Sequence, residues 1–404
     1  MDATSISVRL LKGSRVTEQH VEFVERKGLG HPDYIADSVA EEFSRCLSAY
    51  YLEEFGTILH HNVDKTLLVG GQARPVYGGG EIITPILIVQ AGRATKQVLY
   101  DGKLRDVPVG RLAVESAKRW ISKNLRYMDP ERHIVVDHKI NPSSVDLVSL
   151  YNAGAKKTPL SNDTSFGVGF APLTPLEKTV LSVERTLNSE AFKRRVPESG
   201  EDIKVMGLRR GDEYVLTVAA AIIAPLVKNY EHYLDVKAKI SEEALKVATS
   251  IIGSSKINVH VNTADRDADS AYLTVTGSSA EHGDDGAVGR GNRSNGLITP
   301  NRPMSLEAVA GKNPVSHVGK IYNLVSQRIA DRIVKEFGIT EVYVKMLSQI
   351  GRPIDNPLQV DLEFLGDNER ATIVSKSLES IVREEIEGLP KLTEMLVRGE
   401  LDVC

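Results

Sequence analysis

The chain has 404 residues, 41% hydrophobic and 26% charged, which predicts a globular protein of two or three domains. Its formal net charge of −4 excludes the broad basic field that nucleic acids and acidic membrane surfaces attract. Two cysteines, the lack of an apolar signal run at the N-terminus, and an apolar stretch (213–230) too short for a membrane span favour the cytoplasm.

Segments of strand and helix character alternate along the chain. Alternating or apolar runs predict strands at residues 20–25, 65–71, 82–92, 133–140, 202–210, 213–224, 256–264, 271–277, 341–347 and 358–364. Helical spacing predicts helices at residues 34–56, 114–125, 175–194, 232–253, 314–338 and 370–386. We expect an α+β fold with mixed or antiparallel sheets and helices on one face. Three groups of similar size predict interleaved subdomains, approximately 1–140, 141–270 and 271–404.

The motif Gly-Leu-Gly-His-Pro-Asp precedes the first long predicted helix. Pro32 suits a first helical turn, and the free N–H groups of that turn, with the helix dipole, attract anions. His31 then offers a hydrogen bond and Asp33 a cation ligand, while Asp37 follows one turn later. The alternative is a structural helix start in which Asp33 only complements the dipole.

A glycine-rich segment spans residues 278–313. Its glycines let backbone N–H groups approach a ligand closely. Asp284 and Asp285 are candidates for Mg²⁺ or ribose hydroxyl groups, and Arg290 and Arg293 for phosphate. A disordered surface loop is the alternative interpretation.

The next helix starts among positive charges. Lys312 lies in a Gly-Lys-Asn-Pro turn, and His317 and Lys320 fall in the first turns of the predicted helix. Cations there oppose the helix dipole, and an anionic ligand would remove the conflict. Side chains that simply reach into solvent would remove it too.

Weaker candidates lie at the ends of predicted strands and beside glycines, where polar side chains are also common in ordinary turns. They are Asp64, Lys65, Lys139, Asn141, Ser143, Ser144, Asp163, Thr164, Phe166 and Lys204.

In chain order, these segments resemble the S-adenosylmethionine synthetase (methionine adenosyltransferase) family, in its archaeal branch. The motifs are ERKGLGHPDYIAD, VDKTLLVGGQA, NDTSFGVGFAPLTPLE, DIKVMGLRR and GDDGAVGRGNRSNGLITPNRPMSLEAVAGKNPVSHVGKIYN. The resemblance implies that methionine sulfur attacks C5′ of ATP and expels tripolyphosphate, which is then hydrolysed to pyrophosphate and phosphate. Such a leaving group, with about four negative charges, needs cations and N–H groups aimed at it, whereas a thioether needs no general base.

The resemblance also implies roles for individual residues. His31 corresponds to the histidine that donates to the leaving oxygen, and Asp33 to a Mg²⁺ ligand. Lys204, Arg290 and Lys320 are the further implied catalytic residues. The implied substrate contacts are Asp64, Lys65, Lys139, Asn141, Ser143, Ser144, Asp163, Thr164, Phe166, Asp284, Asp285, Arg293, Lys312, Asn313 and His317.

The family implies two Mg²⁺ ions and a homodimer with active sites at the interface, a tetramer being the alternative. Its potassium ligand has no clear match in this sequence. Gly291 replaces the lysine beside the loop arginine, and NDTSFG replaces the family's hexapeptide, which bears on methionine recognition. An ATP-dependent kinase or phosphohydrolase and a nucleotide-binding regulatory module are the competing interpretations.

Overall fold

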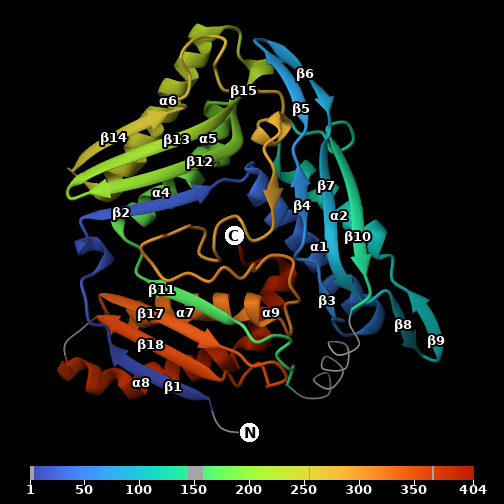
Figure 1. Cartoon of the computed structure of the whole chain (residues 1–404), viewed down its shortest axis with the longest axis vertical. Coiled ribbons are helices and arrows are strands. Elements are labelled where there is room, and N and C mark those ends of the chain that lie inside the picture. The colour runs from blue at the N-terminus through green and yellow to red at the C-terminus, as the bar shows by residue number, and fades with distance from the viewer. Residues whose placement is uncertain (1–3, 144–157, 254, 366–367) are drawn as a thin grey trace.

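The computed structural model describes residues 4–143, 158–253, 255–365 and 368–404. Three larger sheets, each backed by helices, surround the segment that follows residue 278, near the middle of the view in Figure 1. The sheets contain both parallel and antiparallel pairs, so the predicted α+β class is confirmed.

The first sheet has the order β10-β7-β4-β16, with β3 paired to β7. Its strands are β3 His61–Asn62, β4 Leu67–Val69, β7 Ile86–Ala94, β10 Ile134–Asn141 and β16 Gly286–Ala287. Helices α1 (Pro32–Phe55) and α2 (Val109–Asn124) pack on one face, where Ile35, Val39 and Ile88 are fully buried. The two-residue strand β16 brings the glycine-rich segment onto this sheet.

The second sheet has the order β14-β13-β12-β2, and β15 pairs with β13. Its strands are β2 Val21–Lys27, β12 Ser199–Arg210, β13 Glu213–Ile223, β14 Lys256–Val261 and β15 Leu273–Thr274. Helices α4 (Pro175–Leu187) and α6 (Tyr230–Ile252) cover one face around a core that includes Val180, Leu216 and Ile240.

The third sheet has the order β1-β18-β17-β11 and draws on both ends of the chain. Its strands are β1 Ser5–Leu10, β11 Phe166–Ala171, β17 Glu341–Leu347 and β18 Gln359–Leu365. Helices α7 (Val318–Phe337), α8 (Asn368–Glu387) and α9 (Leu389–Arg398) complete its core. The predicted interleaving of chain segments is therefore confirmed.

Shorter elements complete the description. They are the hairpins β5 Gln72–Val76 with β6 Gly79–Thr84 and β8 Gln97–Tyr100 with β9 Lys103–Asp106, helix α5 Glu190–Arg195, and the single turns Val16–Glu18, Ala224–Leu226 and Ser279–His282. Within the described ranges, no helix is long and apolar enough to cross a membrane.

Two predicted elements are each divided in the structure. The strand expected at 82–92 is two strands, because Pro85 separates β6 from β7 and has no N–H for a ladder. The helix expected at 175–194 ends at Leu187, and Ser189 caps the separate helix α5 by accepting the N–H of Phe192.

The sheet faces opposite the helices carry exposed apolar side chains. Alternate residues of β2 and β12 point away from the helices, and Phe23 and Met206 are 48% and 37% exposed there. Leu67 and Val69 of β4 are 44% and 37% exposed. Exposed apolar surface on adjoining strands is typical of an interaction surface.

Candidate active site

Helix α1 begins at His31, which is its N-cap. The Nδ1 atom of His31 accepts the N–H of Asp33 at 3.2 Å, so in the neutral ring the proton lies on Nε2. Burial lowers the pKa of His31, with Asp202, Asp33 and Asp284 opposing this effect, which favours the neutral ring. His31 is thus a hydrogen-bond donor through Nε2, as its predicted role requires.

The glycine-rich segment lies on the first turns of α1. The N–H groups of Ala287 and Gly289 donate to the carboxylates of Asp33 and Asp37, at 3.0 and 2.8 Å. A Cβ atom on Gly286 would lie 2.2 Å from the backbone of Pro32. Gly286 therefore permits close packing on the helix, and the N–H groups of Ala287 and Gly289 bind protein carboxylates instead of a ligand.

Lys27 and Lys204 occupy paired positions on β2 and β12, next to this helix start. The ammonium of Lys27 donates to Asp33 Oδ2 and to the carbonyl of Arg290, both at 2.8 Å. Lys204 forms an ion pair with Glu25 at 3.2 Å and is 39% exposed. Both lysines therefore lie on the outward face of their sheet, where a substrate can reach them.

Two further carboxylates act on His31. The hydroxyl oxygen of Ser279 lies 2.6 Å from Asp202 Oδ2 and 3.0 Å from Asp284 Oδ2 and has one proton to share between them, which places the two acids near each other. Sequence reasoning missed Asp202 as a site residue, although it precedes Lys204 in an acid-x-lysine pattern at the start of a strand. Asp33, Asp202 and Asp284 carry carboxylate oxygens, the kind of ligand that Mg²⁺ prefers, although Lys27 and the N–H of Ala287 already bind Asp33.

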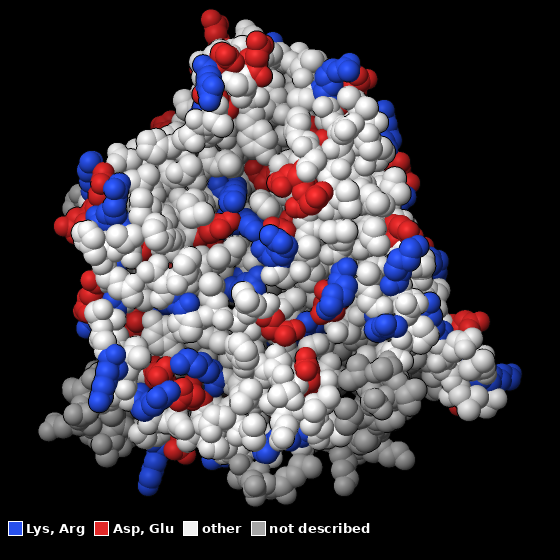
Figure 2. Space-filling view, viewed as in Figure 1, with Lys and Arg blue, Asp and Glu red and all other residues white. Residues whose placement is uncertain are grey.

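A cleft of about 680 Å³ borders the glycine-rich segment. Figure 2 shows basic and acidic side chains gathered around the middle of this face. The cleft is lined by Asp64, Lys65, Ser165, Phe166, Val288, Gly289, Arg290, Met304, Ser305, Leu306, Glu307, Ala308 and Lys312. Five predicted residues from four segments of the chain thus meet at one cavity, namely Asp64 with Lys65, Phe166, Arg290 and Lys312.

One wall of the cleft is a network of ion pairs. Lys312 Nζ lies 2.5 Å from Asp64 Oδ2 and 2.6 Å from Glu307 Oε1, and Lys65 Nζ lies 2.7 Å from Asp64 Oδ2. Burial acts to raise the pKa of Asp64, but the Lys312 and Lys65 ammonium groups outweigh it and lower that pKa. Asp64 is therefore ionised and holds both lysines at the cavity.

Helix α7 begins at His317, whose Nδ1 accepts the N–H of Gly319 at 3.2 Å. Lys320, in the first turn, is fully buried, and its ammonium contacts both oxygens of Glu41 at 2.6 and 2.7 Å. Glu41 also accepts the N–H of Gly311 at 2.9 Å. The dipole conflict at this helix start is thus relieved by a protein carboxylate, and Lys320 does not line the cleft.

Other predicted residues have protein partners. The guanidinium of Arg293 donates to the carbonyls of Gly289, Gly291 and Ser305. Asn313 donates to the carbonyl of Leu59. These contacts stabilise the loop and the turn rather than leaving the side chains open to phosphate.

The remaining predicted residues lie at the edge of the cleft or beyond it. Asp285 accepts the N–H of Gly70, and Asp163 and Thr164 are exposed just before the cleft residue Phe166. Lys139 pairs with Asp137 at the end of β10, Asn141 is exposed, Ser143 contacts His60, and Ser144 lies outside the described residues. Lys27, Glu41 and Glu307 were missed, because only the fold brings them to residues far away in the sequence.

Three helix-backed sheets around a cavity rich in lysine, arginine and carboxylate groups define an α+β enzyme that handles a charged substrate. A family model described as S-adenosylmethionine synthetase (AdoMet synthetase) matches residues 4–400. The chain belongs to this family, and the predicted family and its reaction, synthesis of S-adenosylmethionine from ATP and methionine, are confirmed.

Individual relatives agree with the family match. The chain is 55% identical over 405 residues to the S-adenosylmethionine synthase of Hyperthermus butylicus, covering 99% of each chain. It is 54% identical to that of Pyrobaculum neutrophilum, covering 98% of this chain and all of the relative. A solved S-adenosylmethionine synthetase from Campylobacter jejuni shares the fold, with a TM-score of 0.60, 16% identity and 95% coverage of each chain.

Proposed function

We propose that the methionine sulfur attacks C5′ of ATP at this site and that tripolyphosphate leaves toward the cations of the cleft, to be hydrolysed to pyrophosphate and phosphate. The observation that carries the proposal is the meeting of Lys65, Arg290 and Lys312 at one cavity. Fixed positive charges at a leaving group lower the barrier without reorganisation during the reaction.

The proposed roles follow from the hydrogen-bonding and charged groups that each side chain can still offer to the substrate. His31 donates its Nε2–H to the leaving oxygen, because its Nδ1 is already bound. Lys27 and Lys204 approach the polyphosphate from the outward sheet face. Among the described residues, the guanidinium of Arg290 has no hydrogen-bond or ion-pair partner, which leaves it available to phosphate.

Asp33 remains the proposed Mg²⁺ ligand, which requires that the ion displace the Lys27 ammonium from its carboxylate. Asp33, Asp202 and Asp284 supply oxygen atoms, which are the ligands that Mg²⁺ prefers, and polyphosphate oxygens would complete its shell. The bound ions would neutralise phosphate charge. Two ions, and a potassium ion in addition, stay predictions from the family.

The other predicted substrate contacts remain part of the proposal, and we assign them to the active site of a second protomer. In a homodimer that pairs the apolar outer sheet faces, residues at the strand ends could reach the partner's cleft. The exposed side chains Phe23, Met206, Leu67 and Val69 support such an interface. A tetramer, a cytoplasmic location and subdomain borders near residues 140 and 270 also stay predictions.

The direct test is incubation of the protein with ATP, methionine and Mg²⁺, followed by mass detection of products. We expect S-adenosylmethionine together with pyrophosphate and phosphate. Formation of ADP would support a kinase instead, and binding of ATP without turnover would support a regulatory module. Light scattering of the same sample measures the oligomeric state.

A further inference from the structure

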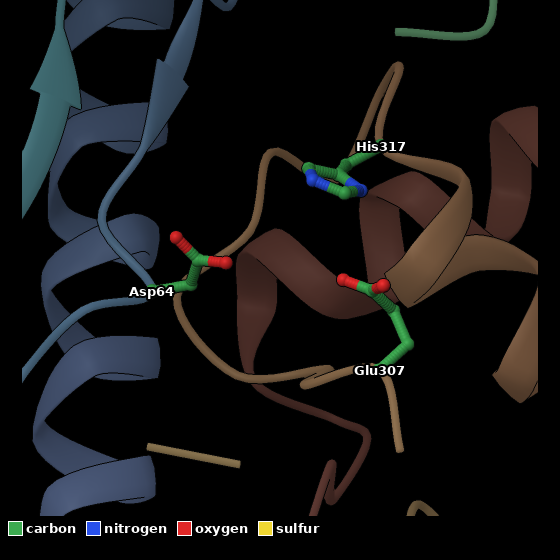
Figure 3. Close-up of side chains that lie close together, drawn as sticks. All are labelled: Asp64, Glu307 and His317. Carbon is green, nitrogen blue, oxygen red and sulfur yellow. The ribbon is translucent and has the colours of Figure 1, made fainter. Parts of the chain in front are cut away.

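The cleft residue Lys312 lies in a turn whose main chain is held from outside the cleft. Its side chain reaches Asp64 and Glu307, and Figure 3 shows these two carboxylates facing a common space with the ring of His317, their ligand atoms within 4.8 Å of one another. Its backbone carbonyl accepts the hydroxyl proton of Ser44, on helix α1, at 3.0 Å. The main chain of Lys312 is therefore attached to α1 while its ammonium lies at the cleft.

A buried histidine on strand β3 continues this contact. His61 Nε2 lies 2.8 Å from the hydroxyl oxygen of Ser44, and His61 Nδ1 lies 3.2 Å from the side-chain nitrogen of Asn313, the residue after Lys312. All four residues are at most 2% exposed. A hydrogen bond lost in such an interior leaves a polar group unsatisfied, which is costly.

The direction of these hydrogen bonds follows from the groups themselves. A carbonyl can only accept, so the single Ser44 proton goes to Lys312, and the Ser44 oxygen accepts from His61. His61 then carries its proton on Nε2, and its Nδ1 accepts one N–H of Asn313, whose other N–H goes to the carbonyl of Leu59 at 3.0 Å. Burial lowers the pKa of His61 to about 3, so the ring stays neutral.

The other tautomer of His61 satisfies fewer groups. A proton on Nδ1 would go to the Leu59 carbonyl, 3.0 Å away, but would also face the N–H of Asn313. The Ser44 proton would then turn to Nε2, and the carbonyl of Lys312 would lose it as a donor. The hydrogen-bonding groups therefore favour the Nε2–H tautomer, in which His61 directs the Ser44 proton to Lys312.

We infer that His61 and Ser44 are positioning residues for the transfer reaction, because together they fix the backbone from which the Lys312 ammonium is aimed into the cleft. The inference rests on the proposed function, in which Lys312 is one of the cations that receive the leaving tripolyphosphate. Neither His61 nor Ser44 lines the cleft, so both act through Lys312 and not on the substrate. A displacement of about 1 Å in such a group costs up to roughly 10²-fold in rate.

The turn has further attachments that keep it folded when this one is removed. Glu41 accepts the N–H of Gly311 at 2.9 Å, and Val63 donates its N–H to the carbonyl of Gly311 at 2.8 Å. Loss of the Ser44 hydroxyl should therefore shift Lys312 without unfolding the turn.

The test is a double-mutant cycle between Ser44→Ala and Lys312→Met, read as kcat for S-adenosylmethionine formation. We expect Ser44→Ala to lower kcat about tenfold and to change the KM of either substrate less than about threefold, because the misplaced group acts in the transition state. In the Lys312→Met background, Ser44→Ala should change kcat less than about twofold, because no ammonium remains to be misplaced.

Rescue at His61 gives an independent test, which also decides the matter if Lys312→Met does not fold. His61→Gln keeps an N–H donor for Ser44, whereas His61→Leu removes it. We expect His61→Leu to lower kcat about tenfold and His61→Gln to retain kcat within about threefold of the wild type.

Ser48→Ala is the matched control for Ser44→Ala. Ser48 is fully buried on the same helix and donates its hydroxyl proton to the carbonyl of Ser44 at 2.8 Å, within the helix. Thermal unfolding should show a similar loss of stability in both variants, because each loses one buried hydrogen bond. Only Ser44→Ala should lose activity.

Three results would overturn the inference. Ser44→Ala could retain the kcat of Ser48→Ala, its loss of kcat could persist in full in the Lys312→Met background, or His61→Gln could be as impaired as His61→Leu. A wild-type kcat in Lys312→Met would show instead that the proposed role of Lys312 is wrong. If the wild type forms no S-adenosylmethionine, the proposed function itself fails.

Discussion

Helix α1 and helix α7 each begin at a histidine whose Nδ1 accepts the N–H two residues ahead, at 3.2 Å in both cases. Around α1, the neighbours are the lysines of an outward sheet face and a loop that donates N–H groups to the helix carboxylates. Around α7, the neighbours are Asp64, Glu307 and the Lys320–Glu41 pair.

The comparison shows that the same histidine N-cap geometry can occur in two sites with different surroundings. In both caps the backbone selects the tautomer and leaves Nε2–H as the donor. What that donor meets is decided by other segments. Three carboxylates and Lys27 lie near His31, whereas three lysines lie near His317 together with Asp64 and Glu307. We therefore expect the two caps to contribute differently, the first through the Nε2–H that His31 donates to the leaving oxygen.

The largest expected effect is on folding stability, at the start of helix α7. Lys320→Met should lower the free energy of unfolding by about 3–5 kcal/mol, because it leaves the Glu41 carboxylate buried without its cation. Urea unfolding measures the change. The double variant Glu41→Gln/Lys320→Met keeps an acceptor for Gly311 and should recover most of the loss. A Lys320→Met variant of normal stability but without activity would instead indicate a substrate contact.

The next prediction compares the capping histidines of the two helices, His31 and His317. His31→Asn retains a capping side chain but removes the donor, so kcat should fall about 10²–10³-fold. Steady-state formation of S-adenosylmethionine measures it, with His317→Asn as the matched variant, in which kcat should change only a few fold. Equal losses of kcat in both variants would contradict the division of roles.

The stability of the protein should depend on pH through Asp37, in helix α1. Burial raises the pKa of Asp37 to about 7, well above its value in an unfolded chain. The native state then holds a proton that the unfolded state has lost, so this group's stabilisation falls as the pH rises from about 4 to 7. Between pH 5 and 7 the loss is about 2–3 kcal/mol.

Asp37→Asn should remove that part of the pH dependence, because the amide does not ionise and still accepts the N–H of Gly289 through its oxygen. Thermal unfolding of both proteins across this pH range checks it. Parallel curves for wild type and variant would show that Asp37 does not titrate there.

The smallest expected effect concerns the loop that links the two regions. Arg290→Ala should raise the KM for ATP about tenfold, or about 1.4 kcal/mol, and leave the free energy of unfolding within about 0.5 kcal/mol, since the side chain is exposed. Arg293→Ala is the contrast, because its guanidinium binds three carbonyls and its loss should destabilise the loop.

Much of the fold and part of the site could be predicted from the sequence. Helical spacing located α1 and α7 closely, and motif order brought out Asp64, Lys65, Arg290 and Lys312 before any cleft was visible. Local spacing reports on single elements and located these two helices well, but it gave no strand at Ser5–Leu10 or Phe166–Ala171 and no helix at Leu389–Arg398.

The rest depends on contacts that sequence spacing does not encode. Glu41 and Lys320 lie 279 residues apart, and the local sequence around either residue does not indicate its partner. The glycines of residues 283–296 suggested ligand approach, but a close approach to a helix demands small residues in the same way. Which partner a glycine or a lysine meets is fixed only by tertiary packing.

The pairing of β1 with β18 affects how the chain is made in the cell. Arg9 on β1 bonds Asp361 on β18, 352 residues further along. At a synthesis rate of about 5–20 residues per second, β1 waits roughly 20–70 seconds on the ribosome before its partner exists. During that time it is an unpaired strand open to other chains. Closure of the third sheet is accordingly a late event after translation, and crowding by nascent copies is the hazard that this topology brings.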